Sequence, residues 1–120
     1  MSIQVLKGSN LSSVIFIRDY IQFVFEGEDD SYILTSLVDE TVVKENITFK
    51  RQTEGWRDAL CSLINKVVKI AIENEGVSLN VLFEDGDILQ INLIEEDLSF
   101  KGKEAAHLFY RDQIVVWHSY

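Results

Sequence analysis

The feature that most constrains the fold is residues 77–93, VSLNVLFEDGDILQINL, where apolar and polar residues alternate on both sides of a short turn. A two-residue turn would place Val81 opposite Gln90, which sets an apolar residue against a polar one on the same face. A three-residue loop with Gly86 in the left-handed conformation instead pairs Val81 with Leu89. The same register gives the pairs Leu79–Ile91, Val77–Leu93, Asn80–Gln90 and Ser78–Asn92. We therefore expect an antiparallel hairpin with acidic residues at its exposed tip.

Most of the remaining chain also has the short alternating segments of strands, joined by connections too short for parallel crossovers. The predicted strands lie near residues 11–17, 20–26, 32–38, 67–74, 77–83, 88–94 and 113–118, with a weaker one near 41–49. Residues 53–68, TEGWRDALCSLINKVV, instead have apolar residues at helical spacing, and Thr53 is placed to cap the helix. A shorter helical turn is expected at residues 102–109. The prediction is a single α+β domain over residues 1–120, with a mostly antiparallel sheet of about seven strands and one main helix packed on one face.

Acidic residues are concentrated in two parts of the chain. Residues 19–45 contain eight acidic residues and one basic residue, and residues 73–97 contain eight acidic residues and no basic one, against a net charge of −9 for the chain. Direct nucleic-acid binding is disfavoured because it requires a basic surface. No apolar run is long enough to span a membrane, and the first ten residues lack the pattern of a secretion signal. With Cys61 as the single cysteine, we expect a protein of the reducing cytoplasm.

The densest acidic stretch is EGEDDSY, residues 26–32, between two predicted strands. Its carboxylates are hard oxygen donors, but they lack the alternating spacing and the central glycine of a calcium loop. Three interpretations remain open: a cation site, a solvated polar turn, and an acidic loop that faces a basic partner. In the last interpretation, Tyr32 at the end of the stretch would be an anchor of the interface.

Two further patterns have both a chemical and a structural interpretation. Cys61 has Arg57 one turn earlier, which would favour the thiolate, yet no histidine follows at helical spacing. Glu104 and His107 have the i, i+3 spacing of one half of a di-iron site, which needs two such motifs on long helices. The sequence contains no phosphate-binding glycine loop, no G-x-S-x-G and no Cys or His cluster. We therefore expect no catalysis, no cofactor and no metal ion.

Four segments, in their order and spacing, resemble a family of small bacterial immunity-type proteins from toxin–immunity loci, including those of contact-dependent growth inhibition. The segments are VIFIRDYIQFVFEG, GWRDALCSLINKVVK, LFEDGDILQINL and GKEAAHL, which fall within residues 11–108. The resemblance implies a protein that binds a cognate toxin and neutralises it without catalysis. In such a family, the segments GEDDSY at 27–32 and RDQIVVWHSY at 111–120 would be the variable ones that recognise the toxin.

Together, the resemblance and the charge pattern give one hypothesis, in which acidic loops bind a basic toxin, expected to be a nuclease domain. The acidic side chains would raise the association rate, and aromatic side chains would provide lasting affinity. The residues expected to contact the toxin are Glu28, Asp29, Asp30, Tyr32, Glu84, Asp85, Asp87, Glu95, Glu96, Asp97, Tyr110, Trp117 and Tyr120. Two alternatives from other classes are a small-molecule or metal-ion binding domain and a structural homo-oligomer.

Overall fold

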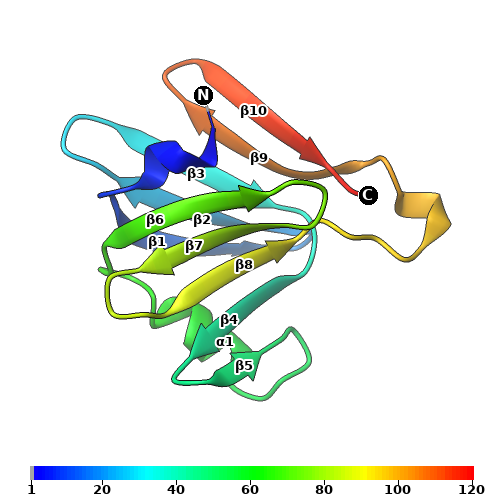
Figure 1. Cartoon of the computed structure of the whole chain (residues 1–120), viewed down its shortest axis with the longest axis horizontal. Coiled ribbons are helices and arrows are strands. Elements are labelled where there is room, and N and C mark those ends of the chain that lie inside the picture. Colours follow the sequence, from blue (N-terminus) through cyan, green and yellow to red (C-terminus); the bar gives the residue numbers. More distant parts are fainter. Residues whose placement is uncertain (1) are drawn as a thin grey trace.

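The computed structural model describes residues 2–120 as two antiparallel five-stranded sheets packed face to face (Figure 1). We call them the terminal sheet, in the order β1-β2-β3-β9-β10, and the central sheet, in the order β5-β4-β8-β7-β6. The terminal sheet consists of β1 (Asn10–Ile17), β2 (Tyr20–Glu26), β3 (Ser31–Ser36), β9 (Glu104–Tyr110) and β10 (Gln113–His118). The central sheet consists of β4 (Glu40–Lys44), β5 (Ile47–Phe49), β6 (Val68–Asn74), β7 (Ser78–Phe83) and β8 (Ile88–Asn92). The helical elements are η1 (Ile3–Leu6), α1 (Trp56–Cys61) and η2 (Leu98–Phe100).

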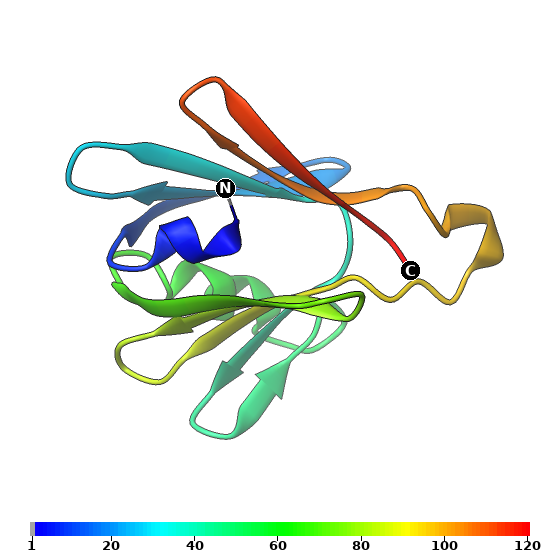
Figure 2. The same cartoon turned by 45° about the horizontal axis from the view of Figure 1, so that its top comes forward.

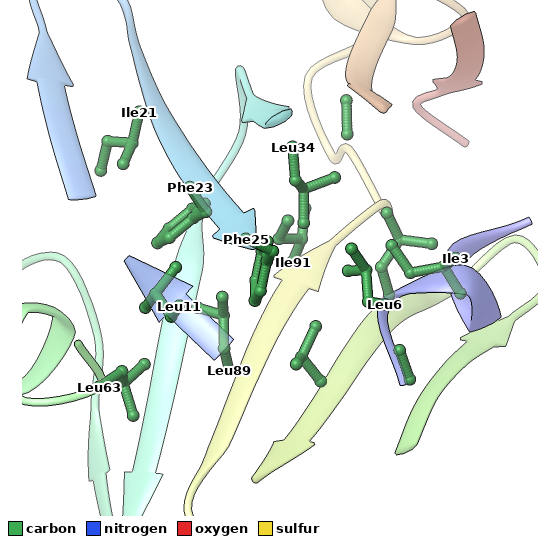
Figure 3. Packing of buried hydrophobic residues seen from close by; sticks show 14 of the residues in the cluster. Ile3, Leu6, Leu11, Ile21, Phe23, Phe25, Leu34, Leu63, Leu89 and Ile91 are labelled. Atoms are coloured by element: carbon green, nitrogen blue, oxygen red, sulfur yellow. The ribbon is translucent and has the colours of Figure 1, made fainter. Parts of the chain in front are cut away.

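The prediction of a mostly antiparallel β fold is confirmed, but the predicted single sheet covered by a helix is wrong. Two sheets bury their apolar faces against each other, so neither face needs a helix to cover it (Figure 2). Fully buried side chains come from both layers, among them Phe23 and Phe25 of β2 and Leu89 and Ile91 of β8 (Figure 3). The hydrophobic core therefore lies between the sheets.

The N-terminal segment also contributes to this core. Ile3 and Leu6 of η1 are fully buried, and Figure 2 shows η1 between the two sheets beside β6. The backbone N–H of Gly8 donates to the carbonyl of Val68 at 2.9 Å, which ties the end of η1 to the central sheet. No helix within residues 2–120 has the length and apolar character needed to cross a bilayer.

The hairpin of residues 77–93 is confirmed in the predicted register. Val81 pairs with Leu89, Leu79 with Ile91, Asn80 with Gln90 and Ser78 with Asn92. Gly86 has a φ of 97°, and Phe83 N–H donates to the carbonyl of Asp87 at 2.9 Å, which closes a three-residue loop. The alternation of side chains on the two faces was therefore sufficient to fix this register.

The helix α1 is much shorter than predicted, and its start differs. Thr53 does not cap it, because its Oγ1 accepts a hydrogen bond from the backbone N–H of Lys50 at 3.0 Å. Gly55, with a φ of 84°, occupies the N-cap position instead. A left-handed residue at this point turns the chain sharply before Trp56, and glycine adopts that conformation without strain.

The helix ends early because the residues after it pair with β1. Asn65 has a φ of 76°, and its backbone N–H donates to the carbonyl of Leu11 at 2.7 Å. Leu11 N–H in turn donates to the carbonyl of Lys66 at 3.1 Å. Leu63, which belongs to the predicted apolar stripe, is still fully buried. The apolar spacing thus identified core residues correctly but overestimated how far the helix extends.

The predicted helical turn at residues 102–109 is wrong, since this segment contains β9, which lies between β3 and β10. Ala105 and Ala106 are fully buried, and small side chains suit this crowded position. An irregularity in the β9–β10 register places Glu104 and His107 near each other, with 3.4 Å between Oε2 and Nδ1. Their proximity is therefore a strand contact and has no helical geometry.

The weak strand predicted at residues 41–49 is two strands, β4 and β5, joined by a two-residue turn. Glu45 and Asn46 in this turn have φ values of 49° and 68°. Two consecutive left-handed residues are typical of the tight hairpin turn whose twist matches that of the flanking strands.

Candidate partner-binding surface

Four turns lie together at one end of the sandwich, which we call the turn end (Figures 1 and 2). The two sheets are linked near this end, because Asn10 bridges to Val67 and the N–H of Glu84 donates to the Val67 carbonyl at 2.9 Å. The turns are residues 27–30, 45–46, 84–87 and 111–112. Together they contain Arg111 and eight acidic residues, namely Glu28, Asp29, Asp30, Glu45, Glu84, Asp85, Asp87 and Asp112.

In the β2–β3 turn, the predicted contact residue Asp30 forms an ion pair within the protein. Asp30 accepts from Arg111 Nε at 2.8 Å and from Arg111 Nη2 at 3.1 Å, and the Tyr110 hydroxyl donates to it at 3.4 Å. This bidentate pair links the β2–β3 turn to the β9–β10 turn. Glu28 and Asp29 remain exposed at the tip.

The predicted aromatic anchors are largely inside the protein. Tyr32 is only 9% exposed and stacks on Tyr110, with ring centroids 4.8 Å apart, and burial raises the pKa of Tyr32. Trp117 is 7% exposed, and its Nε1 donates to Glu73 at 2.9 Å. The expectation that Tyr32 and Trp117 face a partner is therefore wrong. Tyr110 is half-buried, and Tyr120 is exposed.

In the β7–β8 turn, two lysines neutralise two of the acidic residues. Lys66 Nζ forms ion pairs with Asp85 and Asp87, and Lys44 Nζ forms one with Asp87. Asp87 is buried, so the expectation of an exposed Asp87 is wrong, because ammonium groups from two other segments compensate its charge. Asp85 and Glu84 are exposed.

The pKa values of this cluster reflect the same contacts. Burial would raise the pKa of Asp87, but hydrogen bonds from Lys44 and Lys66 outweigh it and hold that pKa below its ordinary value. The hydrogen bond from Lys66 lowers the pKa of Asp85. Burial would lower the pKa of Lys66, yet its hydrogen bonds to the two carboxylates raise it. Asp85, Asp87 and Lys66 are therefore ionised at neutral pH and hold the turn in place.

The other five acidic residues of the turns are free. They have no ion-pair partner within residues 2–120 and are Glu28, Asp29, Glu45, Glu84 and Asp112. These five, rather than the paired Asp30, Asp85 and Asp87, give the turn end its negative surface charge.

An exposed apolar ladder lies on the outer face of the terminal sheet, on the strands that the β2–β3 and β9–β10 turns join. The strand register aligns Val24 with Ile33, Ile33 with Phe109, and Phe109 with Ile114. Phe109 is 44% exposed and Ile114 56% exposed, and Val116 on the same face of β10 is 38% exposed. We call these five residues the outer ladder. Apolar surface of this kind, bordered by free charges, is typical of a protein-binding site.

Sequence reasoning missed the outer ladder because β9 was predicted to be helical. The available signal was LFYRDQIVV, residues 108–116, in which apolar residues flank a two-residue turn. Arg111 and Asp112 have φ values of 48° and 62°, the conformation of a tight hairpin turn. With β9 as a strand, Phe109 and Ile114 fall opposite each other.

The remaining predicted contact residues lie at the opposite end of the molecule, in the segment that contains η2 (Figures 1 and 2). Asp97 caps η2 by accepting hydrogen bonds from the hydroxyl and the backbone N–H of Ser99, and these two bonds lower its pKa. Glu95 N–H donates to the carbonyl of Tyr120 at 2.8 Å, and Glu96 is exposed. A flat partner that covers the turn end does not reach these residues.

The turn end offers charge and apolar surface for binding. Within the described residues 2–120, no group of three or more His, Cys, Asp or Glu side chains is arranged to hold a metal ion. Comparison of the chain with protein-family models, curated proteins and solved structures gives no match, so the functional argument rests on the geometry of this surface.

Proposed function

We propose that this protein binds a cognate basic toxin, a nuclease domain, through the turn end and thereby neutralises it. The observation that supports the proposal is the position of the exposed outer ladder on the two hairpins whose turns carry three of the five free carboxylates, Glu28, Asp29 and Asp112. The resemblance to immunity-type proteins suggests the class of partner. The turn end suggests the surface through which such a partner would bind.

The two parts of this surface have different roles in the proposal. The carboxylates attract a basic groove over a long range, which raises the association rate and is screened by salt. The outer ladder loses water on docking, and burial of apolar surface stabilises the complex by roughly 25 cal/mol per Å². The ion pairs of Asp30, Asp85 and Asp87 fix the turns, so little conformational entropy is lost on binding.

The first test is capture of the tagged protein from its own host at low and high salt, with bound proteins identified by mass spectrometry. We expect a stoichiometric basic partner whose nuclease activity is inhibited in the complex. If the partner stays bound to a Glu28→Lys/Asp29→Lys/Glu84→Lys variant with the same association rate, the turn end is not its docking site.

A matched control separates local charge from net charge. The variant Glu75→Lys/Glu95→Lys/Glu96→Lys changes the same number of charges at the opposite end of the molecule. We expect the turn-end variant to slow association at least tenfold and to flatten its salt dependence, whereas the control variant retains most of the rate. Equal losses in both variants would mean that only net charge matters.

A second candidate function, assembly of a homo-oligomer, is favoured by one observation. β10 is an edge strand without Lys, Arg, Asp, Glu or Pro, and Ile114 and Val116 on it are exposed. Such an edge is open to pairing with another strand. Measurement of mass in solution tests this candidate, and a dimer dissociated by Val116→Lys would favour it over toxin binding.

A further inference from the structure

A groove of about 910 Å³ lies between the β1–β2 turn and α1. The β1–β2 turn is at the strand ends opposite to the turn end, so we call this part of the molecule the groove end. Three arginines from different segments line the groove: Arg18 from the β1–β2 turn, Arg51 from the loop before α1, and Arg57 from α1. Their convergence is unexpected in a chain with a net charge of −9.

Aromatic rings hold two of these guanidinium groups in position. Phe16 and Trp56 meet edge to face, with ring centroids 6.3 Å apart. The Arg57 guanidinium lies 5.7 Å from the centroid of Phe16, and that of Arg51 lies 5.5 Å from the centroid of Trp56. Guanidinium groups that stack on rings are restricted before any ligand binds, which reduces the entropy lost on binding.

The arginines differ in how far their charge is already compensated. Arg51 Nη2 donates to Oε1 of Glu40 at 2.8 Å, and Glu40 is completely buried. Arg18 and Arg57 form no ion pair within residues 2–120. Asp19 and Asp58 also line the groove and equal Arg18 and Arg57 in number, but neither carboxylate forms an ion pair with them within residues 2–120. Two free guanidinium groups therefore remain for an anion.

We propose that the groove binds a small organic anion in which a planar ring carries a phosphate or carboxylate group. Arg18 and Arg57 would bind the anionic group, because a guanidinium fork matches both phosphate and carboxylate oxygens. The ring would pack against Phe16, which is 39% exposed. The groove has the size of small-molecule sites, whereas the net charge of the whole chain disfavours a long polyanion.

The test measures binding of adenosine 5′-monophosphate and of benzoate by calorimetry and by NMR of the Trp56 indole N–H. That N–H donates to the carbonyl of Glu40 at 2.9 Å and reports directly on the groove. We expect one of the two probes to bind and to shift this resonance. Binding of the first alone identifies a phosphate ester as the ligand class, and binding of the second alone identifies a carboxylate.

Substitutions then assign the anion site. Arg18→Gln and Arg57→Gln should each weaken binding of the active probe about tenfold, because each removes a charge-assisted hydrogen bond. Both residues are exposed, so the fold should tolerate the changes, which thermal melting verifies. Lys103→Gln, a charge loss at an exposed position that does not line the groove, is the control and should leave affinity unchanged.

Three results would overturn the proposal. The first is that neither probe binds at about millimolar concentration, where weak sites are still detected. The second is that Lys103→Gln weakens binding of the active probe as much as Arg18→Gln or Arg57→Gln does. The third is that inorganic phosphate, which has no ring, binds as tightly as the active probe. This inference is independent of the proposed function, because the groove end and the turn end are separate surfaces. Loss of toxin binding in the turn-end variants would not affect it.

Discussion

The turn end and the groove end of the sandwich differ in how they hold charge. At the turn end, two lysines and one arginine pair with Asp30, Asp85 and Asp87, and five other carboxylates stay free in solvent. At the groove end, the carboxylate of Glu40 is completely buried, and its Oε2 has no hydrogen-bond partner within residues 2–120.

This difference predicts where the protein is vulnerable. An ion pair near the surface is partly replaced by water when one partner is removed, whereas a buried charge left alone keeps its full desolvation penalty. The groove end should therefore respond to loss of its counter-ion more strongly than the turn end does. The net charge of −9 is therefore a sum over two surfaces whose charged groups are arranged differently.

The largest effect is expected from Arg51→Gln, which leaves Glu40 buried without a counter-ion. We expect a loss of about 3 kcal/mol in the free energy of unfolding at pH 8. Burial raises the pKa of Glu40, against the opposing hydrogen bond from Arg51. A folded-state pKa above the unfolded value means that stability falls as pH rises through that range, so the loss should be smaller at pH 5.

Glu40→Gln provides the control for this substitution. It removes the buried charge, and Arg51 is partly exposed and remains solvated. The double variant Arg51→Gln/Glu40→Gln should recover part of the lost stability and lose the pH dependence between pH 5 and 8. Equal losses at both pH values in Arg51→Gln would contradict a charged, buried Glu40.

A smaller loss, about 2 kcal/mol at pH 7, is expected from Asp87→Asn at the turn end, where Lys44 and Lys66 can still be partly solvated. The pKa of Asp87 is lowered in the folded protein, so its contribution exists above the ordinary carboxyl pKa and disappears as pH falls through the lowered value. In denaturant unfolding between pH 2 and 7, the free energy of unfolding should therefore fall less steeply toward low pH in the variant than in the unchanged protein. Glu84→Gln, a free carboxylate in the same turn, should leave the curve nearly unchanged.

The smallest effects are expected from replacing one glycine at the turn end and one at the groove end by alanine. Gly86 at the turn end and Gly55 at the groove end have φ values of 97° and 84°, and alanine at either position should cost about 1 kcal/mol in thermal unfolding. A Cβ at Gly55 would also lie 3.5 Å from the Phe49 ring, whereas none of the described atoms lies within 4 Å of one at Gly86. Gly55 lines the groove and Gly86 does not, so Gly55→Ala should weaken ligand binding in the groove, whereas Gly86→Ala should not. Weaker ligand binding in both variants would mean that the substitutions act through the stability of the whole fold.

Local patterns predicted the fold where neighbouring residues determine it. The 77–93 hairpin was predictable because two alternating strands and one glycine fix its register. β9 was not, because the segment GKEAAHLF favours a helix by its own composition and becomes a strand only through pairing with β3. The end of α1 likewise depends on the hydrogen bond between Asn65 and Leu11, which no local sequence pattern predicts.

The candidate surface was predictable to a similar degree. The acidic turns follow from the sequence, but their ion-pair partners do not, because Arg111 lies 81 residues from Asp30 and Lys44 lies 43 residues from Asp87. The outer ladder depends on the β3–β9 pairing as well. Burial of Tyr32 and Trp117 depends on how the two sheets pack, which the aromatic residues alone do not indicate.

The order β1-β2-β3-β9-β10 has a consequence for synthesis on the ribosome. All strands of the central sheet are present once residue 92 has left the exit tunnel, whereas β3 must wait for β9 to emerge. Until then the edge of β3 is open and the outer ladder consists of Val24 and Ile33 alone. A surface assembled from such distant segments forms late, because contacts of long sequence separation are slow to close. In the nascent chain this edge of β3 would therefore stay open until β9 pairs with it.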